Sequence, residues 1–271
     1  DKIIENDSSF VSKNDRNSLI DEFITTRDSK GLMNYINKNC NEEEISSVFD
    51  RCFLTSKDFY SKICEEGILL NNAVAHHKYA LSLILASNDL ESEPAKKKNY
   101  KEAKLHLEES IKQGFVLSYF SYARLQYEIF KENNEAFLSA KEGAERGEKY
   151  SKCLLGFFVA HGIGTEKNFN KGVTMMLESN ADDFYEIFAT DYGIYYSNIE
   201  DEQEKTFYWF EKAFNMRQTK ATINNYGICY MKGIGVSKNV NKAIEIFKIG
   251  LNLNDMNSMY HLGFIFEEND Q

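Results

Sequence analysis

Residues 226–243 read YGICYMKGIGVSKNVNKA, and a related segment, LGFFVAHGIGTEKNFNKG, occupies residues 155–172. A shift of 71 residues carries the first glycine, the Gly-Ile-Gly turn, the Lys-Asn pair and the following lysine of one segment onto those of the other. Self-similarity at a fixed interval is the signature of repeat proteins, in which each repeat buries its apolar face only against its neighbours. The two segments therefore predict a protein built from stacked repeats.

Small residues mark two positions of this repeat along the chain. The first position follows an aromatic residue or a leucine and falls at Ala80, Ala123, Gly156, Gly193, Gly227 and Gly263. The second position falls at Ala103, Ala136, Gly172, Thr206 and Ala243. From a second position to the next first position the distance is 20 or 21 residues, whereas from first to second it varies between 13 and 23. The variable length predicts a solvent-exposed loop between two helices, named helix A and helix B, and the constant length predicts a fixed turn into the next repeat.

Glycine stands at the first position of four of the six A helices. A glycine in a helix interior costs about 0.8–1 kcal/mol relative to alanine. Its recurrence at one register predicts that helix B crosses helix A there, too closely for a larger side chain. The glycines of the Gly-Ile-Gly turns are expected to supply positive φ between helices A and B.

Capping residues locate the starts of the B helices. Asn99, Asn168 and Asn239 each stand one residue before a predicted helix B and are predicted N-caps. The segment Ser87–Asn99, which holds Pro94 and a run of lysines, is predicted to be a loop. The resulting fold class is all-α, a right-handed α-α superhelix (solenoid) of about five to six two-helix repeats over residues 76–271. Residues 1–75 form an N-terminal helical cap, of which residues 42–75 fit a degenerate repeat.

These residues resemble the Sel-one-like repeat family, whose members are relatives of the tetratricopeptide repeat. The family pattern has a glycine in helix A, a tyrosine three residues on, a Gly-x-Gly-Val turn, and a Lys-Ala pair followed by an aromatic residue. The fifth repeat matches it at Gly227, Tyr230, Gly233, Gly235, Val236, Lys242, Ala243 and Phe247. The first two repeats depart from it, with Ala80 and Ala123 in place of glycine and Gln126 in place of an aromatic residue. The resemblance implies an adaptor that holds partner proteins, since few members are enzymes.

Charge and composition narrow the kinds of partner. The net charge of −10 disfavours binding to a phosphate backbone, so no nucleic acid is expected. No apolar run reaches the roughly 20 residues of a membrane span, and the start at Asp1 suggests a piece of a longer protein. Five cysteines without a Cys-x-x-Cys pair are predicted to be reduced, which favours the cytoplasm.

The candidates for chemistry are few. The five histidines have no zinc-site spacing and the Gly-Ile-Gly turns lack the strand–turn–helix context of a phosphate loop, so neither metal nor cofactor is expected. Cys153 and His161 are the only basis for an alternative function, a thiol-dependent or hydrolytic enzyme. They carry no catalytic sequence signature. The main prediction is therefore a non-catalytic protein.

The predicted binding surface is the concave side of the solenoid, lined by the A helices. Residues three before, one after and four after the first small residue are expected to point into this groove. About half of them are expected to pack against the next A helix instead, and the rest to hold a protein or peptide partner. The predicted partner-binding residues are His77, Leu81, Phe120, Arg124, Tyr127, Phe157, Ile194, Asn224, Ile228, Met231, Tyr260 and Phe264.

Overall fold

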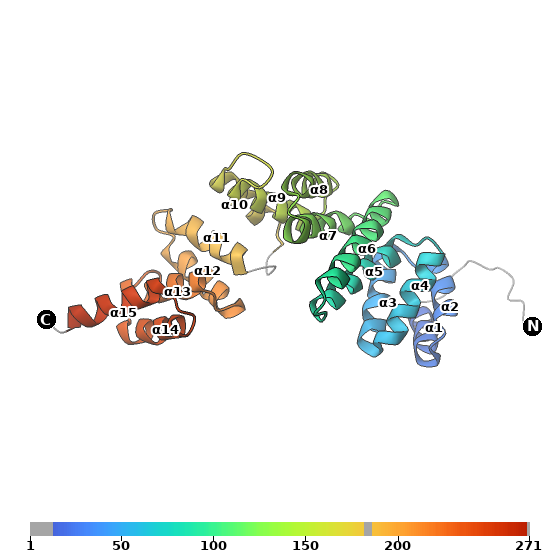
Figure 1. Cartoon of the computed structure of the whole chain (residues 1–271), viewed down its shortest axis with the longest axis horizontal. Helices are drawn as coiled ribbons and strands as arrows, with labels where there is room; N and C mark the ends of the chain where they lie inside the picture. Colours follow the sequence, from blue (N-terminus) through green and yellow to red (C-terminus); the bar gives the residue numbers. More distant parts are fainter. Residues whose placement is uncertain (1–12, 182–185, 270–271) are drawn as a thin grey trace, which may run out of the picture. The chain divides into compact units, whose positions relative to one another are not determined.

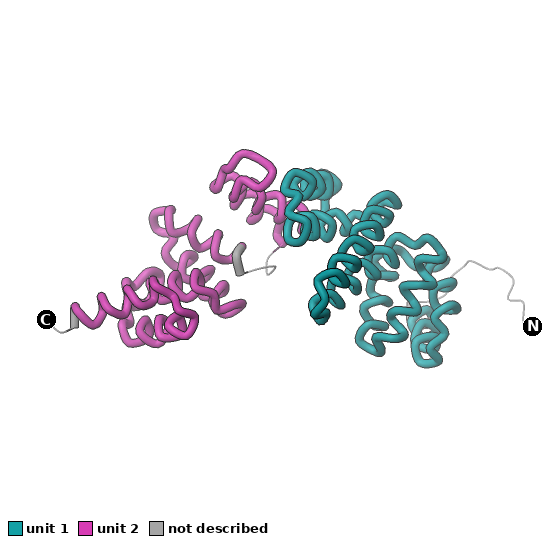
Figure 2. The backbone as a smooth tube through the Cα atoms, viewed as in Figure 1, with its two compact units in different colours: residues 1–148 teal, residues 149–271 magenta. Residues whose placement is uncertain are grey.

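The chain folds into consecutive helices (Figure 1). The structure, a computed structural model, describes residues 13–181 and 186–269, and this part of the chain contains no β-strand. The predicted all-α fold class is thereby confirmed. The helices fall into two compact units, residues 1–148 and residues 149–271, shown in Figure 2.

Unit 1 begins with four helices that precede the repeats. These are α1 (Lys13–Thr26), α2 (Ser29–Asn39), α3 (Glu42–Thr55) and α4 (Lys57–Leu69). A single core of buried side chains joins them, with Phe49 and Ile63 fully buried at its centre. Two helix pairs follow, made of α5 (Ala73–Asn88), α6 (Glu93–Lys112), α7 (Leu117–Leu125) with its π-helical extension η1 (Gln126–Phe130), and α8 (Asn133–Glu145). Residues 1–12 of the predicted N-terminal segment lie outside the described residues, and its boundary at residue 75 remains a prediction.

Unit 2 holds three further pairs and one more helix. The pairs are α9 (Lys149–His161) with α10 (Phe169–Glu178), α11 (Glu186–Ser197) with α12 (Gln203–Met216), and α13 (Lys220–Lys232) with α14 (Val240–Asn252). The last helix is α15 (Met256–Asn269). In both units each odd-numbered helix from α5 to α13 packs on the helix that follows it. These pairs are the predicted A and B helices, in the predicted register.

The glycines of the A helices lie where helix B crosses. A Cβ atom added at Gly227 would lie 2.5 Å from the Cε1 atom of Phe247, and one at Gly193 would overlap the ring of Phe210. In the α9–α10 pair the backbones themselves meet, because a Cβ at Gly156 would lie 2.6 Å from the carbonyl oxygen of Gly172. Burying a side chain such as Phe247 contributes roughly 1.5–3 kcal/mol. This gain exceeds the helix-propensity cost of the glycine beneath it.

The ends of the helices confirm two of the three predicted caps. The side chains of Asn168 and Asn239 accept hydrogen bonds from the backbone N–H groups three residues on, both at 3.0 Å. Gly233 and Gly235 have φ of 79° and 64°, the positive values expected of the turn. Such backbone conformations favour glycine, which has no Cβ to clash.

The predicted loop Ser87–Asn99 is confirmed only for residues 89–92 and is wrong for the rest of the segment. Helix α5 continues to Asn88, and α6 begins at Glu93 with Ser92 as the N-cap, so Asn99 lies inside a helix. Pro94 stands in the first turn of α6, where its missing N–H group has no intrahelical partner to lose. The lysines that suggested a loop are therefore spaced along the first turns of α6.

We predict opposite effects of alanine at two equivalent glycines. Gly227→Ala is expected to lower the free energy of unfolding by about 1–3 kcal/mol, because the new methyl group collides with the buried Phe247 ring. Gly263→Ala is expected to raise it by roughly 0.5–1 kcal/mol, because no described atom lies within 4 Å of the added Cβ and alanine favours the helix. Urea unfolding of the two variants and the parent protein measures both effects. Equal destabilisation by the two changes would contradict the close A–B contact.

Candidate interaction surface

The predicted groove residues divide into buried and accessible groups. His77, Phe120, Phe157 and Asn224 are buried, and Leu81, Arg124, Tyr127, Ile194, Ile228, Met231, Tyr260 and Phe264 are exposed or half-buried. The buried group fills the contacts between neighbouring helices and offers no surface to a partner. The accessible residues remain candidates for binding.

Two of the buried residues show how neighbouring A helices are joined. The ring of Phe157 on α9 packs against that of Phe188 on α11, with centroids 5.3 Å apart. The His77 ring on α5 hydrogen-bonds through Nδ1 to Oγ of Ser118 on the next A helix, at 2.8 Å. Burial, followed by the charge of Lys78, lowers the pKa of His77 to about 3, so the ring is neutral at physiological pH. Both side chains therefore act in packing rather than in binding.

Asn224 belongs to a buried polar network that anchors α15 to α13. Its Nδ2 donates to Oδ2 of Asp255 at 2.9 Å, and the same carboxylate oxygen accepts from the N–H and the hydroxyl of Ser258, at 2.9 and 2.6 Å. Asp255 thereby caps the start of α15. Burial acts to raise the pKa of Asp255, but the hydrogen bonds from Ser258 and Asn224 outweigh it and hold the pKa below its usual value. Sequence analysis missed Asp255, because its partner Asn224 lies 31 residues earlier in the chain.

The accessible apolar residues of unit 2 recur at one register position. Ile194, Ile228 and Phe264 each follow the first small residue of their A helix, and α13 contacts both α11 and α15. Met231 and Tyr260 occupy the other two predicted positions, four after Gly227 and three before Gly263. The last three A helices of unit 2, α11, α13 and α15, thus carry an apolar stripe, which we call the A-face. In unit 1 the corresponding accessible residues are Leu81, Arg124 and Tyr127, a more polar set.

In the structure, Cys153 and His161 do not come together as the thiol–histidine pair that the alternative enzyme function requires. Cys153 and His161 stand on the same helix α9, eight residues and therefore about 12 Å apart along its axis. His161 instead contacts the buried Asp191 on α11, with Nε2 and Oδ2 2.8 Å apart. Cys153 is itself buried. The His161–Asp191 pair is thus a contact between neighbouring A helices.

The family model of the Sel1 repeat matches four segments of the chain, residues 85–115, 150–179, 192–216 and 221–255. This chain is a Sel1-repeat protein. All four matches fall within residues 76–271, where the sequence resemblance places the repeats. The α7–α8 pair of this Sel1-repeat protein lies outside the matches, yet it packs as the other pairs do.

Two solved structures share the fold of this Sel1-repeat protein. One is a protective antigen of uropathogenic Escherichia coli strains that displays an SLR fold, with a TM-score of 0.62 and 16% identity over 88% of this chain. This chain spans 53% of that antigen's length. The other is a Sel1 repeat protein from Oxalobacter formigenes, with a TM-score of 0.56 and 16% identity, covering 95% of this chain and 83% of the other. No curated protein matches the sequence significantly.

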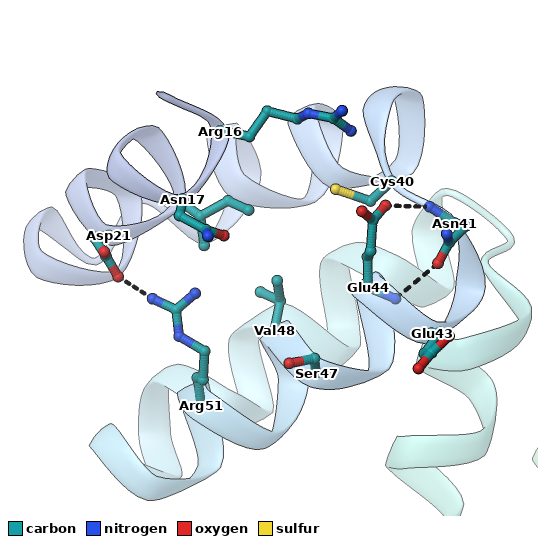
Figure 3. Close-up of a pocket in the computed structure, with 11 residues that line it drawn as sticks. Arg16, Asn17, Asp21, Cys40, Asn41, Glu43, Glu44, Ser47, Val48 and Arg51 are labelled. Carbon is teal, nitrogen blue, oxygen red and sulfur yellow. Dashed lines mark hydrogen bonds and ion pairs between the residues drawn. The ribbon is translucent and has the colours of Figure 1, made fainter. Parts of the chain in front are cut away.

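Hollows also lie outside the A-face, among them two in unit 1 and a shallower one on α12 of unit 2, around Tyr208 and Met216. A polar cleft of about 630 Å³ lies between α1 and α3, and several of its polar side chains already have partners (Figure 3). Arg51 forms an ion pair with Asp21, and at the start of α3 the side chains of Asn41 and Glu44 each accept a hydrogen bond from the other residue's backbone N–H group. These pairings explain the cleft as a contact between helices. The second hollow, of about 480 Å³, is apolar and lies between the start of α6 and η1, around Pro94 and Phe130.

The described residues of this Sel1-repeat protein contain neither a metal-binding cluster nor a membrane-spanning helix. Within residues 13–181 and 186–269, no cluster of three or more histidine, cysteine, aspartate or glutamate side chains is placed to hold a metal ion. No helix in the same ranges is long and apolar enough to cross a membrane. All five cysteines lie in these ranges, and none of them forms a disulfide.

We predict that the thiols react in a fixed order. Cys52, Cys64 and Cys229 are buried, and burial raises the pKa of each to about 12. Cys40 is half-buried, with a pKa raised by burial and then by Glu44. At pH 8 Cys40 is expected to react at least tenfold faster with iodoacetamide than the other four, and all five are expected to react alike in guanidinium chloride. Peptide mapping by mass spectrometry measures this, and fast native labelling of Cys153 would restore the enzyme alternative.

We predict that Asp255 makes stability depend on pH. Because its folded pKa lies below the ordinary value near 3.9, the carboxylate stabilises the fold above that pH and loses this contribution as the pH falls through the lowered pKa. Asp255→Asn keeps an acceptor oxygen but no charge, so it is expected to be less stable at pH 7 by about 1 kcal/mol. Urea unfolding from pH 7 to pH 2.5 should show this difference shrinking below about pH 4. A constant difference across that range would contradict it.

Proposed function

We propose that this Sel1-repeat protein is a non-catalytic scaffold that binds a protein segment on the A-face of unit 2. The observation that carries the proposal is the apolar stripe of Ile194, Ile228 and Phe264 on three consecutive A helices. Isolated apolar residues on a surface are ordinary, whereas a contiguous apolar patch marks an interaction site. Methionine and tyrosine side chains, here Met231 and Tyr260, are frequent in such interfaces.

The repeat family supports the same proposal. Sel1 repeat proteins are generally protein-interaction scaffolds and typically have no catalytic activity. The net charge of −10 favours a protein partner over a nucleic acid, since a polyphosphate would be repelled. A partner that presents apolar side chains from a helix or an extended segment would match the A-face.

We predict that charge on the A-face abolishes binding. The double variant Ile194→Glu/Phe264→Glu is expected to lose at least 90% of the proteins that the parent captures from a cell extract, because each contact would then bury an unpaired carboxylate. Quantitative mass spectrometry of the captured proteins measures the loss.

Tyr208→Glu provides the matched control. Tyr208 is an aromatic residue of helix B α12 with 53% of its surface exposed, comparable to the 42% of Phe264, and it lies off the A-face. This variant is expected to capture the same proteins as the parent. Circular dichroism of both variants verifies that they fold. If a folded double variant captures the parent's full set of proteins, the A-face is not the binding surface.

A further inference from the structure

Helix α6 extends farther at its start than the other B helices. It begins at Glu93, ten residues before Ala103, the second small residue of its repeat. The other four B helices begin three residues before the equivalent position. The additional residues 93–99 add about two helical turns, or roughly 10 Å of length. Such an insertion in one repeat lies at the surface of the stack, often on its binding face.

A second departure from the repeat occurs at the end of α7, where helix A continues into the π-helical turn η1. Turns of this kind are rare and often occur at functional sites. The side chain of Gln126 holds η1 in place, because its Nε2 donates to Glu132 at 2.8 Å and to Glu135. Lys104 of α6 lies 3.3 Å from Oε2 of Glu132 and 5.3 Å from the ring centroid of Phe130. The residues of η1 are therefore tied to both α6 and α8.

These two departures form the walls of the apolar hollow of about 480 Å³. Its apolar lining consists of Pro94 and Tyr100 of α6 with Ile129 and Phe130 of η1. Pro94 is exposed and Ile129 is 38% exposed, so the hollow is open to solvent. Sites for small molecules bury about 70–90% of the ligand surface, which so open a hollow does not achieve. It suits a single bulky side chain that belongs to a longer chain.

Lysines surround the hollow in a chain whose net charge is −10. Residues 93–104 contain five lysines and two glutamates. The acidic residue of the lining, Glu93, is paired with Lys96, their Oε1 and Nζ atoms 2.9 Å apart. Lys97 and Lys101 are exposed, and neither has an ion-pair partner among the described residues. They stand four residues apart on one face of α6, and Lys97 also lines the hollow.

The spacing of Lys97 and Lys101 matches an extended chain of negative charge. Four residues of a helix span about 6 Å along its axis, and side chains on one face of an extended segment recur about every 6.6 Å. Carboxylates at alternate positions of such a segment meet the two lysines, while a further side chain on the same face enters the hollow. The acidic remainder of the protein repels a long polyanion or an anionic membrane, whereas a short acidic segment of a protein avoids that repulsion.

We propose that this hollow and its lysines bind an extended, acidic segment of a partner protein. One bulky apolar side chain of the segment fills the hollow between Pro94 and Phe130. Carboxylates two and four positions away from that side chain pair with Lys97 and Lys101. The hollow belongs to unit 1 and the A-face to unit 2, so the two proposals rest on different residues.

The experiment uses the whole chain and a fluorescent peptide, Glu-Ser-Glu-Ser-Phe-Ser-Glu-Ser-Glu, in fluorescence anisotropy. Carboxylates lie on both sides of the phenylalanine, so either chain direction places two of them beside the lysines. Saturable binding with 1:1 stoichiometry is expected. A peptide with alanine in place of phenylalanine is expected to bind at least about tenfold more weakly, because it has no side chain for the hollow. A peptide with glutamine in place of every glutamate is expected to bind at least about threefold more weakly, because exposed ion pairs contribute less.

The decisive protein variant is Lys97→Glu/Lys101→Glu. It turns attraction into repulsion at both positions and is expected to bind the peptide at least about tenfold more weakly. Both side chains are exposed, so the variant is expected to fold, which circular dichroism verifies. The matched control is Lys171→Glu/Lys248→Glu, which makes the same change in net charge at exposed lysines of α10 and α14. This control is expected to bind the peptide as the parent does.

The apolar part of the site is tested by Ile129→Gln, which places a neutral polar group in the wall of the hollow. It is expected to weaken peptide binding at least about threefold, because apolar area is no longer buried by the peptide. The A-face variant Ile194→Glu/Phe264→Glu is expected to leave peptide binding unchanged. Because the two surfaces share no residue, failure of either proposal leaves the other intact.

Four outcomes would overturn the proposal. The first is the absence of saturable peptide binding, and the second is equal affinity of the parent and Lys97→Glu/Lys101→Glu for the peptide. The third is tighter binding of an oligothymidylate or of phosphatidylserine vesicles that the same variant abolishes, because the occupant would then be a nucleic acid or a membrane. The fourth is a dimer of the free protein in sedimentation velocity that this variant converts to a monomer, because the acidic segment would then belong to a second copy of this chain.

Discussion

The contact between a small residue of helix A and a large side chain of helix B is the constraint on which the repeats depend. At Gly193 and Gly227 an aromatic ring lies directly on the glycine, and at Gly156 and Gly172 the two backbones take the place of that contact. The contact fixes the distance between the helix axes, because any larger side chain would separate them. Once this distance is fixed, the loop from A to B can vary in length at the surface, while the turn from B to the next A cannot.

The side of helix A that packs on helix B is more polar in the first two repeats. His76 of α5 contacts His106 of α6 through their Nδ1 atoms at 2.8 Å. In the second repeat, Gln126 at the end of helix A donates to Glu132 at 2.8 Å and to Glu135. Alanine replaces glycine at the first position of both repeats, so hydrogen bonds replace part of the close apolar contact. The α7–α8 pair keeps the fold with these contacts, although its sequence falls outside the family matches.

Local signals allowed most of the fold to be predicted. The caps at Asn168 and Asn239 and the glycine contacts follow from interactions within one repeat, whose sequence pattern is visible. The start of α6 could not be predicted reliably, because Pro94 and several lysines are equally typical of a loop and of the first turn of a helix. The binding surface was harder to predict than the fold. Whether Phe157 is exposed to solvent or packs against Phe188 depends on the offset between neighbouring A helices. No periodicity within one helix encodes this offset.

The polar network at Asp255 gives the exposed face of α15 a defined orientation. Asn224 and Ser258 hold the first turn of α15 against α13, and the rings of His261 and Phe247 stack farther along the helix, with centroids 4.9 Å apart. A helix tied at its start and along one side has little freedom to turn about its axis. The buried carboxylate of Asp255 thereby holds the helix that carries the A-face residues Tyr260 and Phe264 against α13.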